Sequence, residues 1–244
     1  THDKFKNYEI QDSSISYHRI LKTYILNLTY SIKSTPTNNN NVGAIDQGIR
    51  TPFTIYSPKE VMKIGNDASK KIMKVCKEID IIQSRINKKS YYVKDKHGNK
   101  TFYNVTSERR RNLRKALHRK IQYIKNLRKE LHNKCIRYLC NTYSTIILPP
   151  FKTQEMVGNL QTKTARMMCT LAFYQFKIKL INKAKEYNIN VAQKCEPFTS
   201  KTCGNCGNVK YNLGSAEEYH CYKCGLRIDR DINGARNILL RNIK

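Results

Sequence analysis

Two Cys-x-x-Cys pairs near the C-terminus constrain the fold of this chain more than any other feature of its sequence. The first pair is Cys203 and Cys206, the second is Cys221 and Cys224, and 14 residues lie between the pairs. A glycine follows each pair directly. Four thiolates presented by two such turns form the closed tetrahedral ligand set that zinc prefers in structural sites. The spacing therefore predicts a small zinc ribbon whose Zn2+ is architectural.

Two other interpretations of these cysteines are four reduced thiols without metal and a redox-active dithiol. Both pairs occur in the same glycine-turn setting, which favours zinc over either alternative. In a chain without a secretory signal the nine cysteines do not indicate a disulfide framework. The cysteines outside the two pairs lie on apolar faces of predicted elements and are interpreted as core residues: Cys76, Cys135, Cys140, Cys169 and Cys195.

The charge balance of the chain indicates a polyanionic partner. Lys and Arg number 46 against 18 Asp and Glu, which gives a formal net charge of +28 over 244 residues. The pI near 9.8 is typical of proteins that bind nucleic acid. A lysine-rich solvated surface from an AT-rich genome is the alternative, but it does not explain why acidic residues are so few. The mean hydropathy of -0.66 and the absence of a signal pattern predict an intracellular protein, cytoplasmic or nuclear, that neither spans a membrane nor is secreted.

The hydrophobic pattern predicts strands first and then helices that alternate with strands. Alternating apolar residues predict a strand with one buried face within 19–32, and turn signals divide 42–65 into a β-meander. Further elements are expected as an amphipathic helix at 67–88, a hairpin around His97-Gly98, a long helix from Ser107, a strand at 142–150, a helix at 162–187, a strand at 189–196 and a final helix at 232–241. This order indicates an α/β core that carries a small metal module.

The long helix predicted from Ser107 carries an apolar stripe and basic residues at most other positions. Only Glu108 and Glu130 offer acidic partners within 107–130. Such a face follows a phosphate backbone and releases counterions, whereas the alternative is a solvated helix face. The candidate nucleic-acid-binding residues are Arg109, Arg110, Arg111, Arg114, Arg119 and Lys120.

Carboxylates stand where predicted elements end or begin. Asp46 ends the apolar run VGAI, Glu196 ends the strand INVAQKC, and both Asp229 and Asp231 precede or open the last helix. Nucleases that act through two divalent ions need several convergent carboxylate oxygens. For Asp229 or Asp231 taken alone, the ordinary role is a helix N-cap. Only the combination indicates a metal site.

Several longer stretches resemble a known family. The stretch EPFTSKTCGNCG with YHCYKCGLRIDRDINGARNIL closely resembles the C-terminal signature of the TnpB and Fanzor nucleases, the OrfB-type accessory proteins of insertion sequences, which are related to type V CRISPR effectors. AIDQGIRTPFTIYSP resembles the first RuvC motif of that family, and PPFKTQEMV, TARMM and SKTC follow in the family order. The resemblance covers roughly residues 42–241. It implies an α/β fold of the RNase H-like, RuvC-like type with a mixed sheet, flanking helices and an inserted zinc ribbon.

The resemblance also implies an activity and its residues. A metal-dependent DNA endonuclease is expected, with Mg2+ or Mn2+ in addition to Zn2+, and with DNA and a guide RNA from the mobile element as partners. By position, Asp46 matches the first catalytic aspartate and Asp231 the last. Asp229 is a neighbour that some relatives share.

The sequence departs from the family pattern in two places. Where many relatives end a strand in Glu-Asp-Leu, this chain reads Pro149-Pro150, and we expect Glu196 to replace the missing acid, with Glu155 as its competitor. Asp46, Glu196 and Asp231 are therefore the expected Mg2+ ligands. The second departure is that only 45 residues precede Asp46, so the chain is expected to be a fragment, a split gene or a decayed copy.

The expected organisation has four parts. They are the remnant of an N-terminal β domain with a linker (1–41), a nuclease core with basic helices at 66–88 and 107–141 (42–198), the zinc ribbon (199–228) and the last nuclease motif with its helix (229–244). The alternative to a nuclease is a catalytically idle nucleic-acid-binding remnant. A plain zinc-ribbon transcription factor is a third interpretation, but it leaves the RuvC-like motifs unexplained. No feature of the sequence predicts the oligomeric state.

Overall fold

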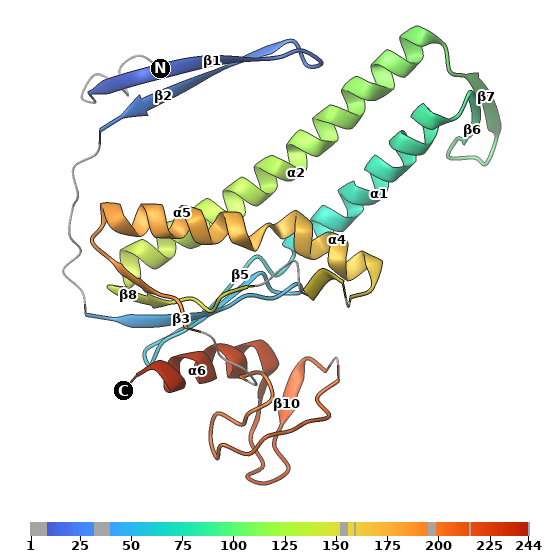
Figure 1. The fold of residues 1–244 in the computed structure, drawn as a ribbon. Helices are drawn as coiled ribbons and strands as arrows, with labels where there is room; N and C mark the ends of the chain where they lie inside the picture. Colours follow the sequence, from blue (N-terminus) through green and yellow to red (C-terminus); the bar gives the residue numbers. More distant parts are fainter. Residues whose placement is uncertain are drawn as a thin grey trace. The chain divides into compact units, whose positions relative to one another are not determined.

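The computed structural model describes residues 9–31, 40–151, 156–158, 160–194, 199–214 and 216–243. Figure 1 shows the helices and strands of this part of the chain. In chain order they are β1 (Ile10–His18), β2 (Thr23–Tyr30), β3 (Val42–Asp46), β4 (Phe53–Tyr56), β5 (Val61–Ile64), α1 (Ala68–Asn87), β6 (Ser90–Lys94), β7 (Lys100–Asn104), α2 (Ser107–Thr142), β8 (Thr145–Ile147), α4 (Thr162–Leu171), α5 (Phe173–Glu186), β9 (Asn190–Ala192), β10 (Glu218–His220), β11 (Arg227–Asp229) and α6 (Arg230–Asn242).

The chain forms two compact units. The sheet unit comprises Ser34–Lys70 and Arg128–Lys244, and the helical unit comprises Thr1–Lys33 and Lys71–Leu127. In the described ranges, no helix combines the length and the apolar character that crossing a bilayer requires.

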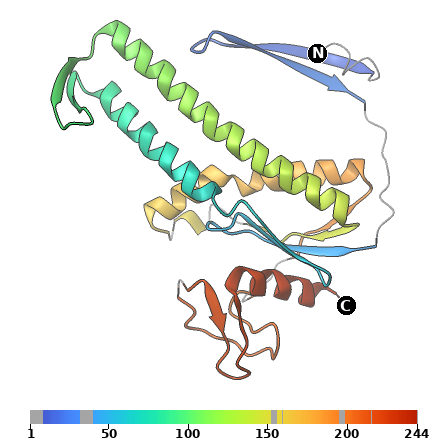
Figure 2. The same cartoon turned by 180° about the vertical axis from the view of Figure 1, so that it is seen from behind.

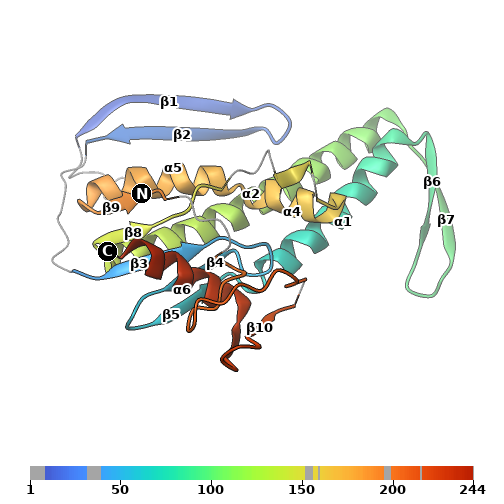
Figure 3. The same cartoon turned by 60° about the horizontal axis from the view of Figure 1, so that its bottom comes forward.

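The sheet unit is built on a five-stranded mixed sheet with the order β5-β4-β3-β8-β9. Strands β3, β4 and β5 form the antiparallel meander that the sequence predicts, and β8 and β9 run parallel to β3. Figures 1 and 3 show α6 on one face of this sheet and α5 on the other. Because both faces are covered, the centre of β3 is an uninterrupted run of buried residues.

Each face of the sheet has its own apolar contacts. On the side of α6, Ala44 and Ile147 pack against Ile238 and Leu239. On the side of α5, the Phe53 ring lies 4.1 Å from the Phe176 ring, centroid to centroid. The sheet is thus fixed between α6 and the helices that follow β8.

His132 is a buried polar residue within this aromatic core. Its Nε2 atom donates to the Leu171 carbonyl oxygen at 2.9 Å, and its Nδ1 atom has no hydrogen-bond partner among the described residues. The imidazole ring lies edge-on to Phe53 and Phe176. Burial lowers the pKa of His132 from 6.5 to about 4, and nearby Lys179 and Arg128 act in the same direction. The neutral tautomer with its proton on Nε2 is therefore the folded form.

The helical unit contains two antiparallel hairpins and most of α1 and α2. Figures 1 and 2 show α1 and α2 running side by side with the β6–β7 hairpin between them in the chain. Lys120 of α2 and Glu78 of α1 form an ion pair at 2.6 Å. The predicted hairpin around Gly98 and the predicted start of the long helix at Ser107 are both confirmed.

Three sequence expectations differ from the structure. The strand predicted within 19–32 lacks a buried face, because within the described ranges β1 and β2 pair only with each other in a two-stranded sheet. The helix predicted at 162–187 is broken at Ala172, which adopts a left-handed conformation with φ +50° between α4 and α5. Cys169 is exposed rather than buried, whereas Cys76, Cys135 and Cys140 are buried as predicted. Cys195 lies outside the described residues.

Lowering the pH from 6.5 to 4 is expected to destabilise the fold through His132. The unfolded chain binds a proton on this side chain below pH 6.5 while the folded chain does so only below about 4, so stability is full above pH 6.5 and falls by about 3 kcal/mol over that window. Urea unfolding at several pH values measures this loss. His132→Gln keeps a donor for the Leu171 carbonyl and cannot titrate, so its unfolding should depend less steeply on pH. An equal slope in both proteins would contradict the assignment.

Candidate functional site

The four cysteine sulfurs of the two Cys-x-x-Cys pairs converge. The Sγ atoms of Cys203, Cys206, Cys221 and Cys224 all lie within 4.8 Å of one another. Cys203 and Cys224 approach to 3.6 Å, as do Cys206 and Cys221. Four thiolates around zinc at about 2.3 Å each are separated by about 3.8 Å in a tetrahedron. The cluster therefore fits a Zn2+ ion, as the spacing predicts.

The two cysteine turns share one backbone geometry. The Gly207 N–H donates to the Cys203 carbonyl at 3.0 Å, and the Gly225 N–H donates to the Cys221 carbonyl at 2.9 Å. Both glycines have positive φ, +73° and +72°, which side-chain-bearing residues rarely adopt. This explains why a glycine follows each cysteine pair. Beneath the cluster, Tyr219 is fully buried.

Two asparagines of α6 attach the ribbon to the sheet unit. The Asn233 amide donates to the Thr202 carbonyl at 2.7 Å, and its oxygen accepts from the Gly204 N–H at 3.0 Å. Asn237, one helical turn later, donates to the carbonyls of Thr199 and Thr202 at 2.8 and 2.7 Å. Both asparagines are buried. If the ribbon moved away from α6, the buried amides and the carbonyls they bind would lose their hydrogen bonds, which is costly. These bonds therefore fix the ribbon against α6.

Asp46 ends β3 where α6 crosses the sheet. Its backbone pairs with Thr54 of β4, and its carboxylate faces Gly234 of α6. A Cβ atom on residue 234 would lie 2.6 Å from Asp46 Oδ2, which is closer than such contacts allow. Burial, followed by the charge of Asp231, raises the pKa of Asp46 to about 7, although the Gln47 N–H and Arg230 act against the rise. A charge at this position is thus incompletely compensated by the protein.

Asp231 is the second carboxylate of this region. It lies in the first turn of α6 and is half-buried. Burial and the neighbouring Asp229 raise its pKa, while Arg50, Lys63 and Arg230 oppose the rise. Asp46 and Asp231 are therefore electrostatically coupled, and both disfavour their ionised forms unless a cation joins them.

Asp229 has both carboxylate oxygens engaged. One oxygen caps α6 by accepting the N–H groups of Asp231 and Ile232 at 3.0 and 3.1 Å. The other accepts from Lys63 Nζ at 2.5 Å. Burial raises the pKa of Asp229, but the Lys63 ammonium and the two N–H groups outweigh it and hold the pKa below its usual value. The helix-cap interpretation of Asp229 is confirmed.

The two glutamates proposed from the sequence lie outside the described residues. Glu196 falls within 195–198, Glu155 falls within 152–155, and strand β9 ends at Ala192. Among the described residues, the four cysteines are the only group of three or more His, Cys, Asp or Glu side chains close enough to hold a metal ion together. Asp46 and Asp231 therefore supply acidic oxygens, but no third acid joins them in the part of the chain that the structure describes.

Sequence reasoning missed four residues that contribute to this region. Lys63 lies in the short strand β5, and no local pattern points to it. Asn233 and Asn237 are spaced four residues apart on one helix face, a signal that identifies a shared contact. The need for a glycine at position 234 follows only from the proximity of the Asp46 carboxylate, which the sequence does not reveal.

The basic residues of α2 differ in their surroundings. Arg111, Arg114 and Arg119 are exposed. Lys120 is paired with Glu78, and the Arg109 guanidinium lies over the Tyr103 ring at 3.8 Å from its centroid. Arg110 is half-buried, and its Nε atom has no partner among the described residues.

Comparisons with known proteins match most of the chain. A family model described as "Cas12f1-like, TNB domain" matches residues 173–238. A putative transposase of Paramecium bursaria Chlorella virus 1 is 33% identical over 86% of this chain and 45% of its own length. A TnpB-like protein of Acanthamoeba polyphaga mimivirus is 31% identical over 95% of this chain and 43% of its own length. The chain thus spans less than half the length of these relatives.

A solved structure shows the same fold. The cryo-EM structure of a Cas12f1–sgRNA–target DNA complex aligns with a TM-score of 0.65 over 97% of this chain and 47% of that chain, at 15% identity. The likeness, together with the mixed sheet and the cysteine cluster, confirms the predicted RuvC-like α/β fold class.

Purified protein is expected to carry about one Zn2+ per chain, and Cys221→Ser is expected to lose it. Because the ribbon has little apolar core of its own, zinc ligation supplies its folding free energy, and its loss should expose residues 199–229 to protease. Metal analysis and limited proteolysis measure both effects. Cys169→Ser is the matched control, since Cys169 is exposed and outside the cluster. A zinc-free parent protein with an intact ribbon would refute the site.

Proposed function

We propose that this chain, which belongs to the TnpB family of transposon-associated nucleases, is the RuvC-like part of a divalent-metal-dependent DNA endonuclease guided by RNA. The observation that carries the proposal is the coupling of Asp46 and Asp231 across the junction of β3 and α6. Burial raises the pKa of both carboxylates, and the charge of Asp231 adds to the rise at Asp46 while that of Asp229 adds to the rise at Asp231. Such coupled acids are typical of catalytic metal sites.

The metal site of this proposal uses Asp46, Asp231 and Glu196. Carboxylate oxygens are the ligands that Mg2+ and Mn2+ prefer. When bound, divalent ions activate water and stabilise the leaving oxygen of a phosphodiester. Asp46 and Asp231 would hold the metal, and Glu196 would supply the third acid.

The surrounding residues of the chain position these ligands. Asp229 caps α6 and holds the backbone N–H of Asp231, while Lys63 holds Asp229. Gly234 leaves room for the Asp46 carboxylate against α6. Arg50 and Lys63 also oppose the negative charge at Asp231. These contacts hold Asp46 and the start of α6, with Asp231, at the junction of β3 and α6.

Nucleic acid is the proposed partner. The net charge of +28 and the exposed arginines of α2 support it. The aligned Cas12f1 structure contains an sgRNA and target DNA, and by analogy we propose a guide RNA and a DNA target for this chain. An intracellular location, in the cytoplasm or the nucleus, accords with four thiols grouped without disulfides.

A nucleic-acid-binding remnant without nuclease activity is the second candidate. Two observations favour it: no third acid accompanies Asp46 and Asp231 among the described residues, and the chain spans less than half of its relatives. The zinc ribbon and the basic helix serve either candidate. An assay for DNA cleavage distinguishes the nuclease from the inactive remnant.

Single-stranded and duplex DNA should be cleaved in Mg2+ or Mn2+ and remain intact with a chelator. Asp46→Asn and Asp231→Asn should each abolish cleavage, because an amide cannot supply the anionic oxygen. Gel-resolved cleavage of labelled DNA measures the effect. Asp67→Asn is the control, since Asp67 is an exposed carboxylate at the start of α1. Glu196→Gln should behave like Asp46→Asn, and cleavage by the Asp46→Asn protein would overturn the assignment.

Replacing Arg111, Arg114 and Arg119 together by Ala should flatten the salt dependence of nucleic-acid binding. Each phosphate that the protein no longer neutralises lowers the slope of log affinity against log salt by about 0.7 to 0.9, so the slope should fall by about two to three. Fluorescence anisotropy at several salt concentrations measures it. Lys120→Ala should change the slope less, because Glu78 already engages Lys120. An unchanged slope in the triple variant would assign these arginines to solvation.

A further inference from the structure

The β6–β7 hairpin joins α1 to α2 and has two chemically different faces. Figure 1 shows it at the end of the α1–α2 pair. Its register places Tyr91 opposite Tyr103, Tyr92 opposite Phe102, and Lys94 opposite Lys100. Successive side chains of a strand point to opposite faces, so the first pair lies on one face and the other two pairs on the other.

The inner face holds the hairpin to the helices. The Tyr91 and Tyr103 rings are stacked with centroids 5.8 Å apart. The Arg109 guanidinium of α2 lies 3.8 Å from the Tyr103 centroid, and that of Arg85 of α1 lies 5.2 Å from the Tyr91 centroid. Tyr91 is buried. These contacts fix the orientation of the hairpin within the helical unit.

The outer face presents an aromatic pair to solvent. The Tyr92 and Phe102 rings lie 5.0 Å apart, with 66% and 51% of each residue exposed. Cross-strand aromatic pairs stabilise hairpins, but the inner pair already serves that purpose here. The two large rings of the outer pair are therefore exposed to water, although the hairpin does not need them for its stability.

Positive charge adjoins the aromatic pair on the same face. Lys94 and Lys100 stand directly opposite each other, an arrangement that like-charge repulsion disfavours. Asp95 is the only acid between residues 88 and 104. Its carboxylate is used within the turn, where it accepts from the His97 N–H at 2.8 Å and from the Asn99 N–H and amide at 2.9 and 3.0 Å. The face therefore carries two cations that the hairpin itself leaves uncompensated.

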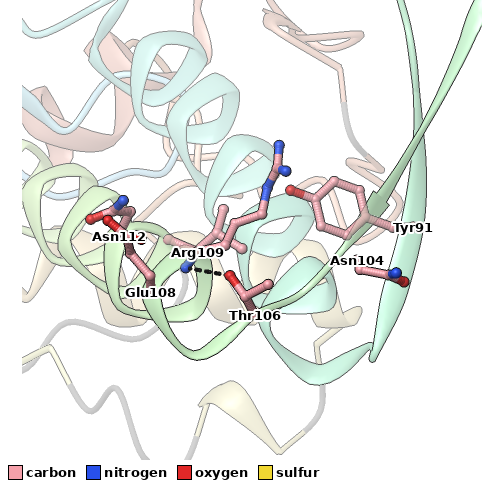
Figure 4. Close-up of a pocket in the computed structure, with 7 residues that line it drawn as sticks. Tyr91, Asn104, Thr106, Glu108, Arg109 and Asn112 are labelled. Atoms are coloured by element: carbon pink, nitrogen blue, oxygen red, sulfur yellow. Dashed lines mark hydrogen bonds between the residues drawn. The ribbon is translucent and has the colours of Figure 1, made fainter.

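A hollow of about 540 Å3 lies where the hairpin meets α2. Tyr91 and Asn104 of the hairpin line it, and Arg109 and Glu108 contribute from α2. Figure 4 shows Arg109 extending from the helix toward Tyr91. No hydrogen bond or ion pair engages the Arg109 guanidinium among the described residues. The outer face thus combines two cations with two exposed aromatic rings, and Arg109 adds positive charge where the hairpin meets α2.

We propose that this outer face is a stacking platform for unpaired bases of an RNA, with phosphates held by Lys94 and Lys100. Aromatic side chains beside a basic groove bind single strands in this way. RNA is the favoured partner because its loops and ends already present unpaired bases, whereas duplex DNA would first have to unstack. The exposed Tyr92 hydroxyl can also hydrogen-bond a ribose 2′-hydroxyl. The inference rests on the proposed nucleic-acid partnership and not on cleavage.

Binding of labelled oligo(U), of an abasic RNA of equal length and of oligo(dT) to the full chain tests the platform at fixed salt. All proteins carry Asp46→Asn, so that cleavage does not affect the readout. The double variant Tyr92→Ile with Phe102→Ile removes both aromatic rings and places a β-branched residue, which favours strands, at each position. It should weaken oligo(U) binding about fivefold or more, which is the lower range for loss of base stacking. Abasic RNA binding should not change, and the unaltered platform should bind oligo(dT) more weakly than oligo(U).

The β1–β2 hairpin supplies the matched control. Tyr17 and Tyr24 also form an exposed cross-strand pair, 50% and 75% exposed, but residues 9–31 carry two basic and two acidic residues, so complementary charge is missing. Tyr17→Ile with Tyr24→Ile should leave binding unchanged. Lys94→Gln with Lys100→Gln should weaken oligo(U) and abasic RNA alike, and it keeps the test valid if the aromatic variant unfolds the hairpin.

Five results would overturn the platform. They are no loss of oligo(U) binding in the Tyr92 and Phe102 variant, an equal loss on abasic RNA, an equal loss in the Tyr17 and Tyr24 variant, equal affinity of the unaltered platform for oligo(dT), and no loss in the lysine variant. Absence of all nucleic-acid binding would overturn both the platform and the proposed function. Normal oligo(U) binding without metal-dependent cleavage by the unmodified chain would overturn the nuclease alone.

Discussion

The docking of α6 between the zinc ribbon and the end of β3 is the interaction on which the rest of the site depends. Asn233 and Asn237 bind the backbone of the ribbon from one side of the helix. Gly234, between them in sequence, leaves the space that the Asp46 carboxylate occupies. One helix face therefore joins the metal module to the carboxylate at the end of β3. The cysteine cluster and the candidate catalytic acids are parts of a single arrangement.

The electrostatics of the site follow from this docking. Helix α6 needs a cap at its N-terminus, and Asp229 supplies it while Lys63 neutralises the remaining oxygen. Asp231 and Asp46 lie in regions of low solvation, where the Gln47 N–H and the nearby cations offset the effect of burial only in part, so the pKa of each is raised. Three aspartates thus divide into one that organises the helix and two that are poised for a cation. That division supports a metal-dependent reaction more directly than the mere presence of three acids.

Local patterns in the sequence predict much of this arrangement. The cysteine spacing predicts the ribbon, the alternating and helical patterns predict the meander and α2, and the family signature predicts the RuvC-like fold. The pairing of Lys63 with Asp229 joins residues 166 positions apart, and no local pattern encodes it. The break at Ala172 interrupts a continuous apolar periodicity, because tertiary packing of Phe173 and Phe176 on Phe53 overrides the helical pattern. Glu196 as the third metal ligand and the four-part domain organisation stay predictions.

The most direct measurement of the central claim is Mn2+ binding, followed by electron paramagnetic resonance, in Gly234→Ala and Gly158→Ala proteins. Alanine is the better helix former, so α6 should persist in the first variant. Its added methyl group would nevertheless lie 2.6 Å from Asp46 Oδ2, whereas a methyl group on residue 158 meets nothing within 4 Å. The account predicts that Gly234→Ala loses Mn2+ binding while keeping its Zn2+, and that Gly158→Ala binds Mn2+ like the unmodified chain. Unchanged Mn2+ affinity in a folded Gly234→Ala protein would contradict a metal site at the junction of β3 and α6.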